Sequence, residues 1–294
     1  MPENLEKIMA TLRRSGPSMS DALRAEIVAL GPSVVRRLIA LVEDPDAEPA
    51  SIHAVDLLID MKADEAIVPM LRVLNDCDML LMDRIFVRLP ELGAAVLEPA
   101  LSLAPAREDE DVPLGVCEML ANLGLRDERI FNVLVRALRR DFMAAGALAA
   151  YGDQRALPLL EHALWTYKPN FMNVWCRIHV RELVDAHGQL GGVLPTELRR
   201  KVDTWLVRWD DIDRRLAEYA KPVAEVAENM HQLDVDYVIW TFCKLAVIQD
   251  HVKREAALRA VVKHMPEPHR REFAMDARRM IARHRKMFPE FHMN

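Results

Sequence analysis

The chain of 294 residues has few of the residues that mark β structure. It contains 10 glycines, 4 tyrosines and 5 tryptophans, whereas turn-dense sheets need more glycine and strands favour aromatic side chains. The four cysteines lie tens of residues apart, so no pair has the spacing of a zinc knuckle or of a disulfide framework. No stretch approaches the roughly 20 uninterrupted apolar residues of a membrane-spanning helix. We therefore expect a helical, cytoplasmic protein.

The common motifs of catalysis are also missing. The sequence contains no GxGxxG, P-loop, GxSxG or HExxH pattern, which excludes the most frequent dinucleotide, nucleoside triphosphate and hydrolase sites. His179 and Glu182 are one helical turn apart, as in di-iron bundles, but a second such motif and two further glutamates are absent. The sequence thus predicts no cofactor and no metal site, and it favours a protein without enzymatic activity.

The charge is divided unevenly along the chain. The whole sequence has 39 Lys and Arg against 45 Asp and Glu, a net charge of −6. Residues 251–294 hold 11 basic against 5 acidic residues, a net of +6, and the rest holds 28 against 40, a net of −12. Because a polyanion is bound through local basic patches, only the C-terminal stretch is a candidate for that role.

A repeat is the most informative feature of the first half. An apolar-periodic segment ends and another begins at Leu30-Gly31, Met61-Lys62, Leu92-Gly93 and Leu123-Gly124, which are 31 residues apart, and again at Tyr151-Gly152 after 28. Each break is followed by apolar residues at helical spacing, and the glycines suit left-handed helix caps. A fixed period of this length is typical of stacked helix pairs, which bury their apolar faces against their neighbours.

The residues around these breaks carry a family resemblance. A Leu-Gly step followed by leucines at helical spacing and a closing aspartate, after an Ala- and Leu-rich helix, resembles the HEAT-like repeats of the phycobilin-lyase type. The best matches are Ala29–Asp44, Met61–Asp76 and Ala150–Leu164, and the resemblance covers about residues 17–168. It implies a right-handed α-solenoid, an architecture shared by scaffolds, bilin lyases, DNA glycosylases and a hydroxylase. The hydroxylase type uses His-Glu dipeptides, which this sequence lacks.

We therefore predict an all-α protein with two regions. Residues 1–168 form about five HEAT-like helix pairs, and residues 169–294 form diverged helical repeats that end in a basic helix. Amphipathic segments are expected at 172–187, 195–209, 210–232, 234–250, 251–264 and 268–287. The aspartates at 210, 211 and 213 are predicted to open a helix, where negative charge is favourable.

Candidate partner-binding residues fall in three groups. Arginines on the second helices of the pairs are expected to face a concave surface: Arg36, Arg37, Arg72, Arg136, Arg139, Arg140 and Arg155. Trp205 and Trp209, one turn apart, belong to an aromatic cluster over residues 151–240 that is interpreted either as core or as an aromatic-lined groove. The basic helix contributes Arg278, Arg279 and Arg283. It is interpreted as a solvated cap, as a dock for an acidic partner or the acidic body, or as a contact to nucleic acid or an anionic surface.

The leading hypothesis for function is a non-enzymatic scaffold that holds a protein partner. It depends on the repeat array, the missing catalytic motifs and the 16 methionines, because methionine-rich surfaces adapt to partners. An alternative places an enzyme or carrier on the same scaffold, acting on a nucleic-acid base or a tetrapyrrole. A third hypothesis is a polyanion or membrane-surface sensor that works through residues 268–287.

Overall fold

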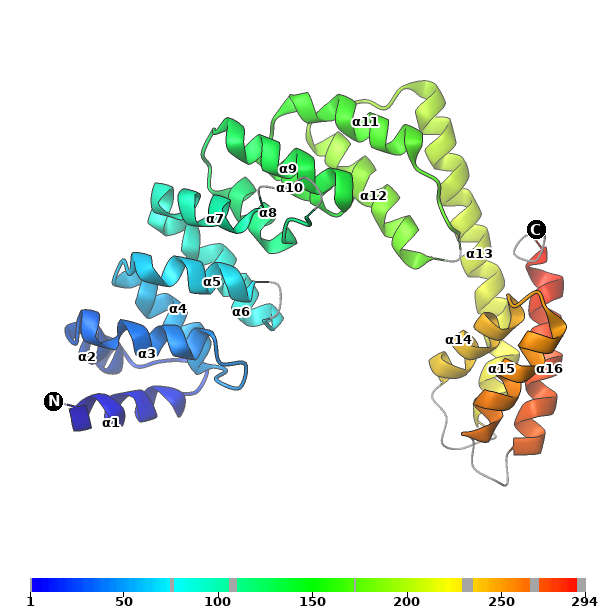
Figure 1. The fold of residues 1–294 in the computed structure, drawn as a ribbon, viewed down its shortest axis with the longest axis horizontal. Coiled ribbons are helices and arrows are strands. Elements are labelled where there is room, and N and C mark those ends of the chain that lie inside the picture. Colours follow the sequence, from blue (N-terminus) through cyan, green and yellow to red (C-terminus); the bar gives the residue numbers. More distant parts are fainter. Residues whose placement is uncertain are drawn as a thin grey trace. The chain divides into compact units, whose positions relative to one another are not determined.

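The computed structural model describes residues 2–74, 77–105, 110–171, 173–228, 235–264 and 270–289, and these residues are helical with no strand among them (Figure 1). The helices of the first half are α1 (Pro2–Arg13), α2 (Asp21–Ala29), α3 (Pro32–Val42), α4 (Ala50–Asp60), α5 (Ile67–Val73), α6 (Met79–Arg88), α7 (Leu97–Leu103), α8 (Leu114–Asn122), α9 (Glu128–Arg140), α10 (Ala144–Tyr151) and α11 (Leu157–Thr166). The later helices are α12 (Val174–Gln189), α13 (Thr196–Glu228), α14 (Val235–Ala246), α15 (His251–Lys263) and α16 (Arg270–Met287), and short 3-10 turns are η1 (Asp64–Ala66), η2 (Leu89–Val96) and η3 (Gln154–Ala156). The all-α prediction is confirmed.

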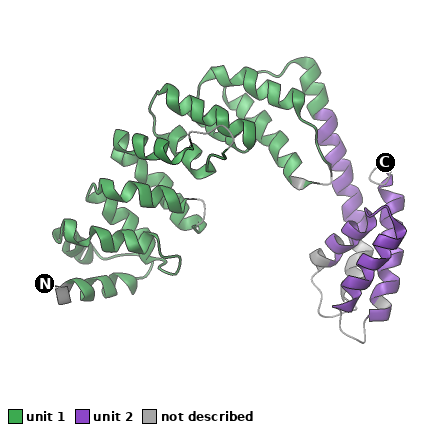
Figure 2. Cartoon of the chain, in the orientation of Figure 1, with its two compact units in different colours: residues 1–202 green, residues 203–294 purple. Residues whose placement is uncertain are grey.

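Two compact units divide the chain, residues 1–202 and residues 203–294 (Figure 2). The boundary lies inside α13, so this helix contributes to both units. The boundary expected from the sequence, between residues 168 and 169, falls between α11 and α12 within the first unit.

In the first unit the helices follow one another as pairs. First helices contact first helices, as α2 with α4, α4 with α6, α8 with α10 and α10 with α12. Second helices contact second helices, as α3 with α5, α5 with α7 and α7 with α9. Each pair thus buries its apolar stripe against its neighbours, because two helices alone leave that stripe exposed.

The predicted breaks have an unusual backbone. All five residues that follow a break have a positive φ: Gly31 (58°), Lys62 (54°), Gly93 (61°), Gly124 (69°) and Gly152 (73°). The predicted left-handed cap is present at Gly152, with a ψ of 27°. Gly31 and Gly93 instead combine positive φ with ψ of −147° and −133°, a region open almost only to glycine. The 31-residue spacing therefore marks real changes of chain direction.

Two first helices of the first unit, α4 and α10, are largely buried. Nine of the eleven residues of α4 are buried, and α10 is built mainly of buried alanines. Small side chains let α10 approach α8 and α12 closely. Gly146 of α10 shows how close this approach is, because a Cβ there would lie 2.4 Å from a carboxylate oxygen of Glu182 on α12.

One helix prediction is wrong. The sequence suggested two helices, over 195–209 and 210–232, but α13 continues through the aspartates without interruption. No glycine or proline separates residues 196–221, and Asp211 is neutralised within the helix by Arg214 and by Arg215, the latter at 3.0 Å. Such i,i+3 and i,i+4 pairs support a helix interior, so a helix start is not needed to explain the acidic run.

In the second unit, α16 packs against α14 and α15. Phe273 of α16 contacts Phe242 of α14 with ring centroids 5.4 Å apart. The Tyr219 hydroxyl of α13 donates a hydrogen bond to the Met280 carbonyl at 3.1 Å, and burial raises the pKa of this tyrosine. The unit thus has an aromatic core of its own.

Candidate functional site

The seven arginines predicted on second helices fall into two groups: those that form ion pairs or hydrogen bonds with described residues, here called engaged, and those that form none, here called unengaged. Four have partners within the first unit: Arg37 with Glu6, Arg136 with the Pro105 carbonyl, Arg140 with Asp111, and Arg155 with Asp153 and Glu128. Three are exposed and make no ion pair or hydrogen bond with a described residue: Arg36, Arg72 and Arg139. The unengaged arginines are the better candidates for contact with a partner.

At the junction between the third and fourth pairs, Arg129 bridges two acidic residues. Its guanidinium lies 2.8 Å from Asp127, the N-cap of α9, and 2.9 Å from Glu98 of α7. The hydrogen bond from Arg129 lowers the pKa of Asp127. The arginine therefore ties the start of one second helix to the preceding one.

The next junction repeats this arrangement with Arg155. Its guanidinium lies 2.7 Å from Asp153 and 2.9 Å from Glu128 of the preceding pair, and it lowers the pKa of Asp153. The same group lies over the ring of Phe131, 4.2 Å from the centroid. An arginine at this site thus combines bidentate carboxylate contacts with stacking on an apolar surface.

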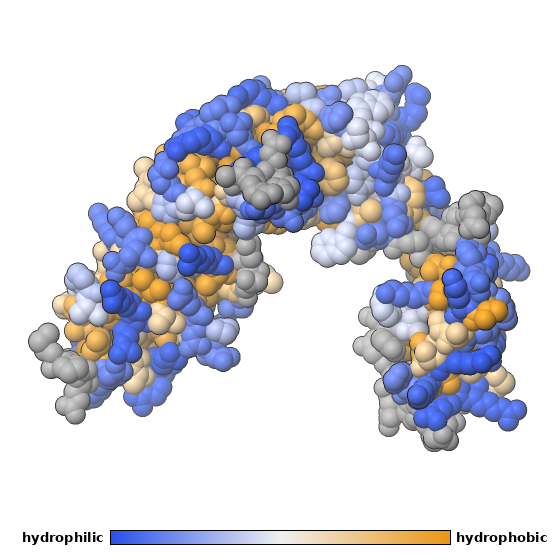
Figure 3. Space-filling model, in the orientation of Figure 1, coloured by the Kyte–Doolittle hydropathy of each residue, from blue (hydrophilic) through white to orange (hydrophobic). Residues whose placement is uncertain are grey.

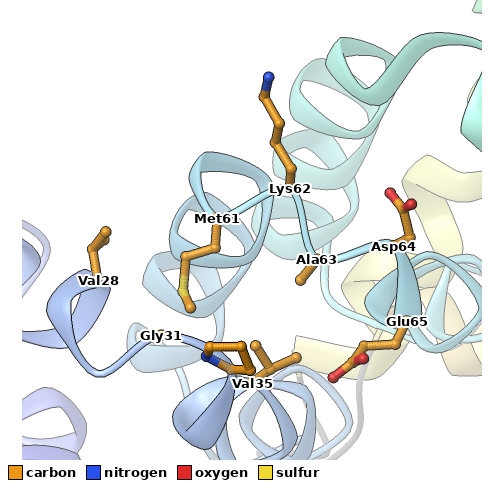
Figure 4. Close-up of a pocket in the computed structure, with 9 residues that line it drawn as sticks. Val28, Gly31, Val35, Met61, Lys62, Ala63, Asp64 and Glu65 are labelled. Carbon is orange, nitrogen blue, oxygen red and sulfur yellow. The ribbon is translucent and has the colours of Figure 1, made fainter.

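The first junction holds an open pocket instead of an arginine (Figure 4). The pocket has a volume of about 390 Å³. It is lined by residues of the first two pairs: Val28, Gly31, Pro32, Val35, Met61, Lys62, Ala63, Asp64 and Glu65. Figure 4 shows the Glu65 carboxylate directed toward Val35, whereas the Lys62 side chain points away from Val35. The pocket therefore has an apolar floor, and its lining also includes the acidic residues Asp64 and Glu65 and the basic residue Lys62.

A second pocket, of about 570 Å³, lies at the other end of the same helix pairs. Its lining residues come from α3, α5 and the loops that follow them, and from α4 and α6: Val42, Glu43, Asp44, Pro45, Glu48, Ser51, Arg72, Val73, Cys77, Asp78 and Leu81. Arg72, one of the predicted site arginines, thus lines this pocket. Asp78 is occupied as the N-cap of α6, where it accepts hydrogen bonds from the amides of Leu80 and Leu81.

Next to this second pocket, α6 exposes large apolar side chains. Met79, Leu80 and Val87 are 70%, 60% and 66% exposed. Leu80 and Val87 are seven residues apart and share one face of the helix, while Leu81 and Ile85 on the opposite face are buried. We call Met79, Leu80 and Val87 the α6 patch. Figure 3 shows apolar surface reaching the exterior of the first unit between hydrophilic margins.

The two candidate tryptophans are buried. Trp205 is 9% exposed and Trp209 is 3% exposed. Both lie on the part of α13 that belongs to the second unit. Other tryptophans do reach the surface, since Trp175 is 57% exposed and Trp240 is 55% exposed. The clustering of aromatic residues in the sequence did not show which tryptophans are buried and which are exposed.

Some arginines of the basic helix α16 form ion pairs within the second unit. Arg278 makes a two-point contact with Glu255 of α15, at 2.7 and 3.1 Å, and lowers the pKa of that carboxyl. Arg279 pairs with Asp276 at 2.9 Å along the same helix, and Arg283 is exposed. Residues 268 and 269 of the predicted helix lie outside the described residues.

The His179 and Glu182 pair is directed to different neighbours. His179 contacts Phe142 and Tyr167 in edge-on geometry, and Glu182 accepts a backbone hydrogen bond from Gly146. Among the described residues, no group of three or more His, Cys, Asp or Glu side chains is arranged to hold a metal ion.

Comparison with known proteins gives no relative from which a role could be transferred. No protein-family model matches the sequence, and no curated protein is significantly similar to it. Within the described part of the chain, no helix has the length and apolar character to cross a membrane.

Proposed function

We propose that the chain is a scaffold protein of the cytoplasm without catalytic activity, and that its first unit is a right-handed solenoid of HEAT-like repeats that holds a protein partner. The proposal is supported by the 31-residue breaks with their positive φ values and by the contacts of each helix pair with the next. Repeat arrays of this kind offer extended surfaces, and they bind through side chains that stacking leaves free.

The observation that carries the proposal is the α6 patch. Its neighbours on the same helix are engaged within the array, because Arg84 and Arg88 pair with Asp56 of α4. Met79, Leu80 and Val87 contribute little to this packing while they are mostly exposed. On this face Asp83 and Arg84 lie between Leu80 and Val87. Exposed large apolar side chains with polar residues among and around them are typical of protein interfaces, where the apolar ones become buried.

Site-specific photo-crosslinking tests the proposal. Benzoylphenylalanine is placed at position 80 or 87 of the full chain in source cells, and at position 252 as the control. Val252 is 76% exposed on α15 and lies in the other unit, so it reports unspecific capture by exposed apolar surface. We expect one discrete protein adduct from both α6 positions and none of the same mass from position 252.

The partner found in this way must then bind in a purified system. Replacement of Leu80 and Val87 by serine is expected to weaken that complex by about tenfold or more, since exposed apolar residues at an interface centre contribute 1–2 kcal/mol each. Absence of an adduct, equal adducts from position 252, or unchanged affinity after the double replacement would refute the scaffold proposal. A visible absorption band in the purified protein would favour a tetrapyrrole carrier in its place.

A further inference from the structure

Glu65 occupies the position that Arg129 and Arg155 occupy at later junctions. The equivalence follows from burial, because three of the second helices start with a buried residue followed four positions later by another: Ala66 with Met70, Ile130 with Leu134, and Ala156 with Leu160. The residue directly before the first of these is Glu65, Arg129 and Arg155, respectively. The third pair has the same pattern in Val96 and Ala100, with Ala95 before it. The first junction therefore carries a carboxylate where two later junctions carry a guanidinium.

Counting from the buried residues of the preceding pair identifies the side chain that faces this position. In the fourth pair, the residue after buried Ile130 is Phe131, and the Arg155 guanidinium lies over its ring. In the first pair, the residue after buried Val34 is Val35, which lines the open pocket together with Glu65. The pocket thus occupies the place that an arginine side chain fills at the later junction.

The pocket also has the chemistry to receive an arginine from outside. Glu65 is exposed and makes no ion pair or hydrogen bond with a described residue, and its carboxylate points toward Val35 (Figure 4). Val28, Val35 and Met61 give an apolar surface for the flat face of a guanidinium, and a carboxylate matches its paired N–H groups. Lysine fits less well, because its ammonium is compact and strongly hydrated.

We propose that this pocket binds the side chain of an arginine presented by a partner polypeptide. The guanidinium lies over Val35 and is held by the Glu65 carboxylate. An apolar side chain and a carboxylate thus hold it, as Phe131 and Glu128 hold Arg155, although here the carboxylate comes from the second pair because the residue equivalent to Glu128 is Pro32. This proposal rests on the proposed scaffold function in one respect, that the partner is a protein. The arginine pocket is a site separate from the α6 patch.

The test uses the full chain labelled with ¹³C at the methionine methyl groups. Met61 lines the pocket, and its signal is assigned with the Met61→Leu variant. The probes are acetyl-arginine amide, acetyl-lysine amide and acetyl-citrulline amide, the last of which keeps the shape of arginine without its charge. We expect saturable shifts of the Met61 signal with the arginine probe, weaker shifts with the lysine probe and none with the citrulline probe.

Two glutamate variants provide the matched comparison. Glu65→Gln is expected to lower the affinity for the arginine probe by about fivefold or more, since it removes the negative charge from the bidentate contact. Glu43→Gln changes another exposed glutamate, at the C-terminal end of α3 and away from this pocket, and this variant is expected to bind the arginine probe like the unmodified chain. Glu65→Arg, which recreates the residue of the later junctions, is expected to abolish binding.

The inference is overturned if no probe shifts the Met61 signal, if citrulline binds as well as arginine, or if Glu65→Gln binds normally. It is also overturned if the chain self-associates through the pocket and Glu65→Gln abolishes this, because the occupant is then a second copy. Failure here leaves the α6 crosslinks unaffected, and loss of those crosslinks with an intact arginine response refutes the scaffold proposal alone.

Discussion

Asp56 offers the sharpest test of how the first unit is held together. Its side chain is 5% exposed on α4, and it faces two arginines of α6, with Arg84 at 2.5 Å and Arg88 at 3.2 Å. The pKa of Arg84 is raised mainly by its hydrogen bond to Asp56. Asp56→Asn keeps the size of the side chain and removes its charge, so two arginines lose a buried counter-ion.

The expected cost follows from the exposure of each partner. Breaking a fully buried ion pair costs about 3–5 kcal/mol, because one charge remains without compensation. Arg84 is 40% exposed and can turn to water, and Arg88 keeps Asp60 and Glu91, each at 2.6 Å. We therefore expect a loss of about 2–3 kcal/mol in the free energy of unfolding, below the fully buried value. Asp60→Asn, at a site 32% exposed, is expected to cost about 0.5–1 kcal/mol.

Amide hydrogen exchange of α4 measures this loss for the first unit alone. Nearly all of α4 is buried, so its amides exchange only when the surrounding pairs open. A loss of 2–3 kcal/mol corresponds to roughly 30- to 150-fold faster exchange. Equal acceleration in Asp56→Asn and Asp60→Asn, or less than about fivefold in Asp56→Asn, would refute the reasoning that burial sets the strength of this pair.

Three further predictions use the backbone and the acidic groups. Gly93→Ala is expected to cost about 1–3 kcal/mol in thermal unfolding because of its φ and ψ, whereas Gly188→Ala inside α12, with open space around it, is expected to stabilise by up to about 1 kcal/mol. Lys62→Gly relieves a positive φ of 54°, and a net gain of about 0.5 kcal/mol in urea unfolding is expected; a loss of stability would contradict it. Burial, with the charge of Asp185, raises the pKa of Glu182 above its ordinary 4.5, so its ionisation opposes folding as the pH rises above that value. Glu182→Gln should therefore be more stable than the unmodified chain at pH 7 and equal to it below pH 4.5, and equality at both pH values would show that the carboxyl is not disfavoured in the fold.

The breaks could be predicted from the sequence because they depend on local chemistry. A helix that ends in glycine after a fixed apolar interval must turn there, and the positive φ at Gly31, Gly93, Gly124 and Gly152 confirms it. Lys62 was placed only by the spacing, since lysine gives no local sign of a positive φ. Periodicity therefore located a turn that residue type alone conceals.

The candidate site was harder to predict from the sequence, because the pairing of side chains depends on the register between neighbouring helices. Nothing local distinguishes Arg36, which is unengaged, from Arg37, which reaches Glu6 on α1, 31 residues away. In the same way, the acidic run at residues 210–213 looked like a helix start, although Asp211 pairs with arginines one turn later on the same helix. A repeat period predicts which helices are neighbours but not which side chains meet between them.

The junctions show how one position per repeat can separate structure from recognition. At the third and fourth junctions an arginine pairs with its own N-cap aspartate and with a carboxylate of the preceding pair, so the surface there is closed by contacts within the array. The second junction has Ala95 at this position. At the first junction the equivalent residue is Glu65, its N-cap position is Ala63, and neither provides a cation. Stacking of the first two pairs does not depend on that ion pair, because Ala66 and Ile67 are buried there. The hydrophobic stripe thus holds the array together at every junction, and the charged position beside it is free to be used for a partner at one of them.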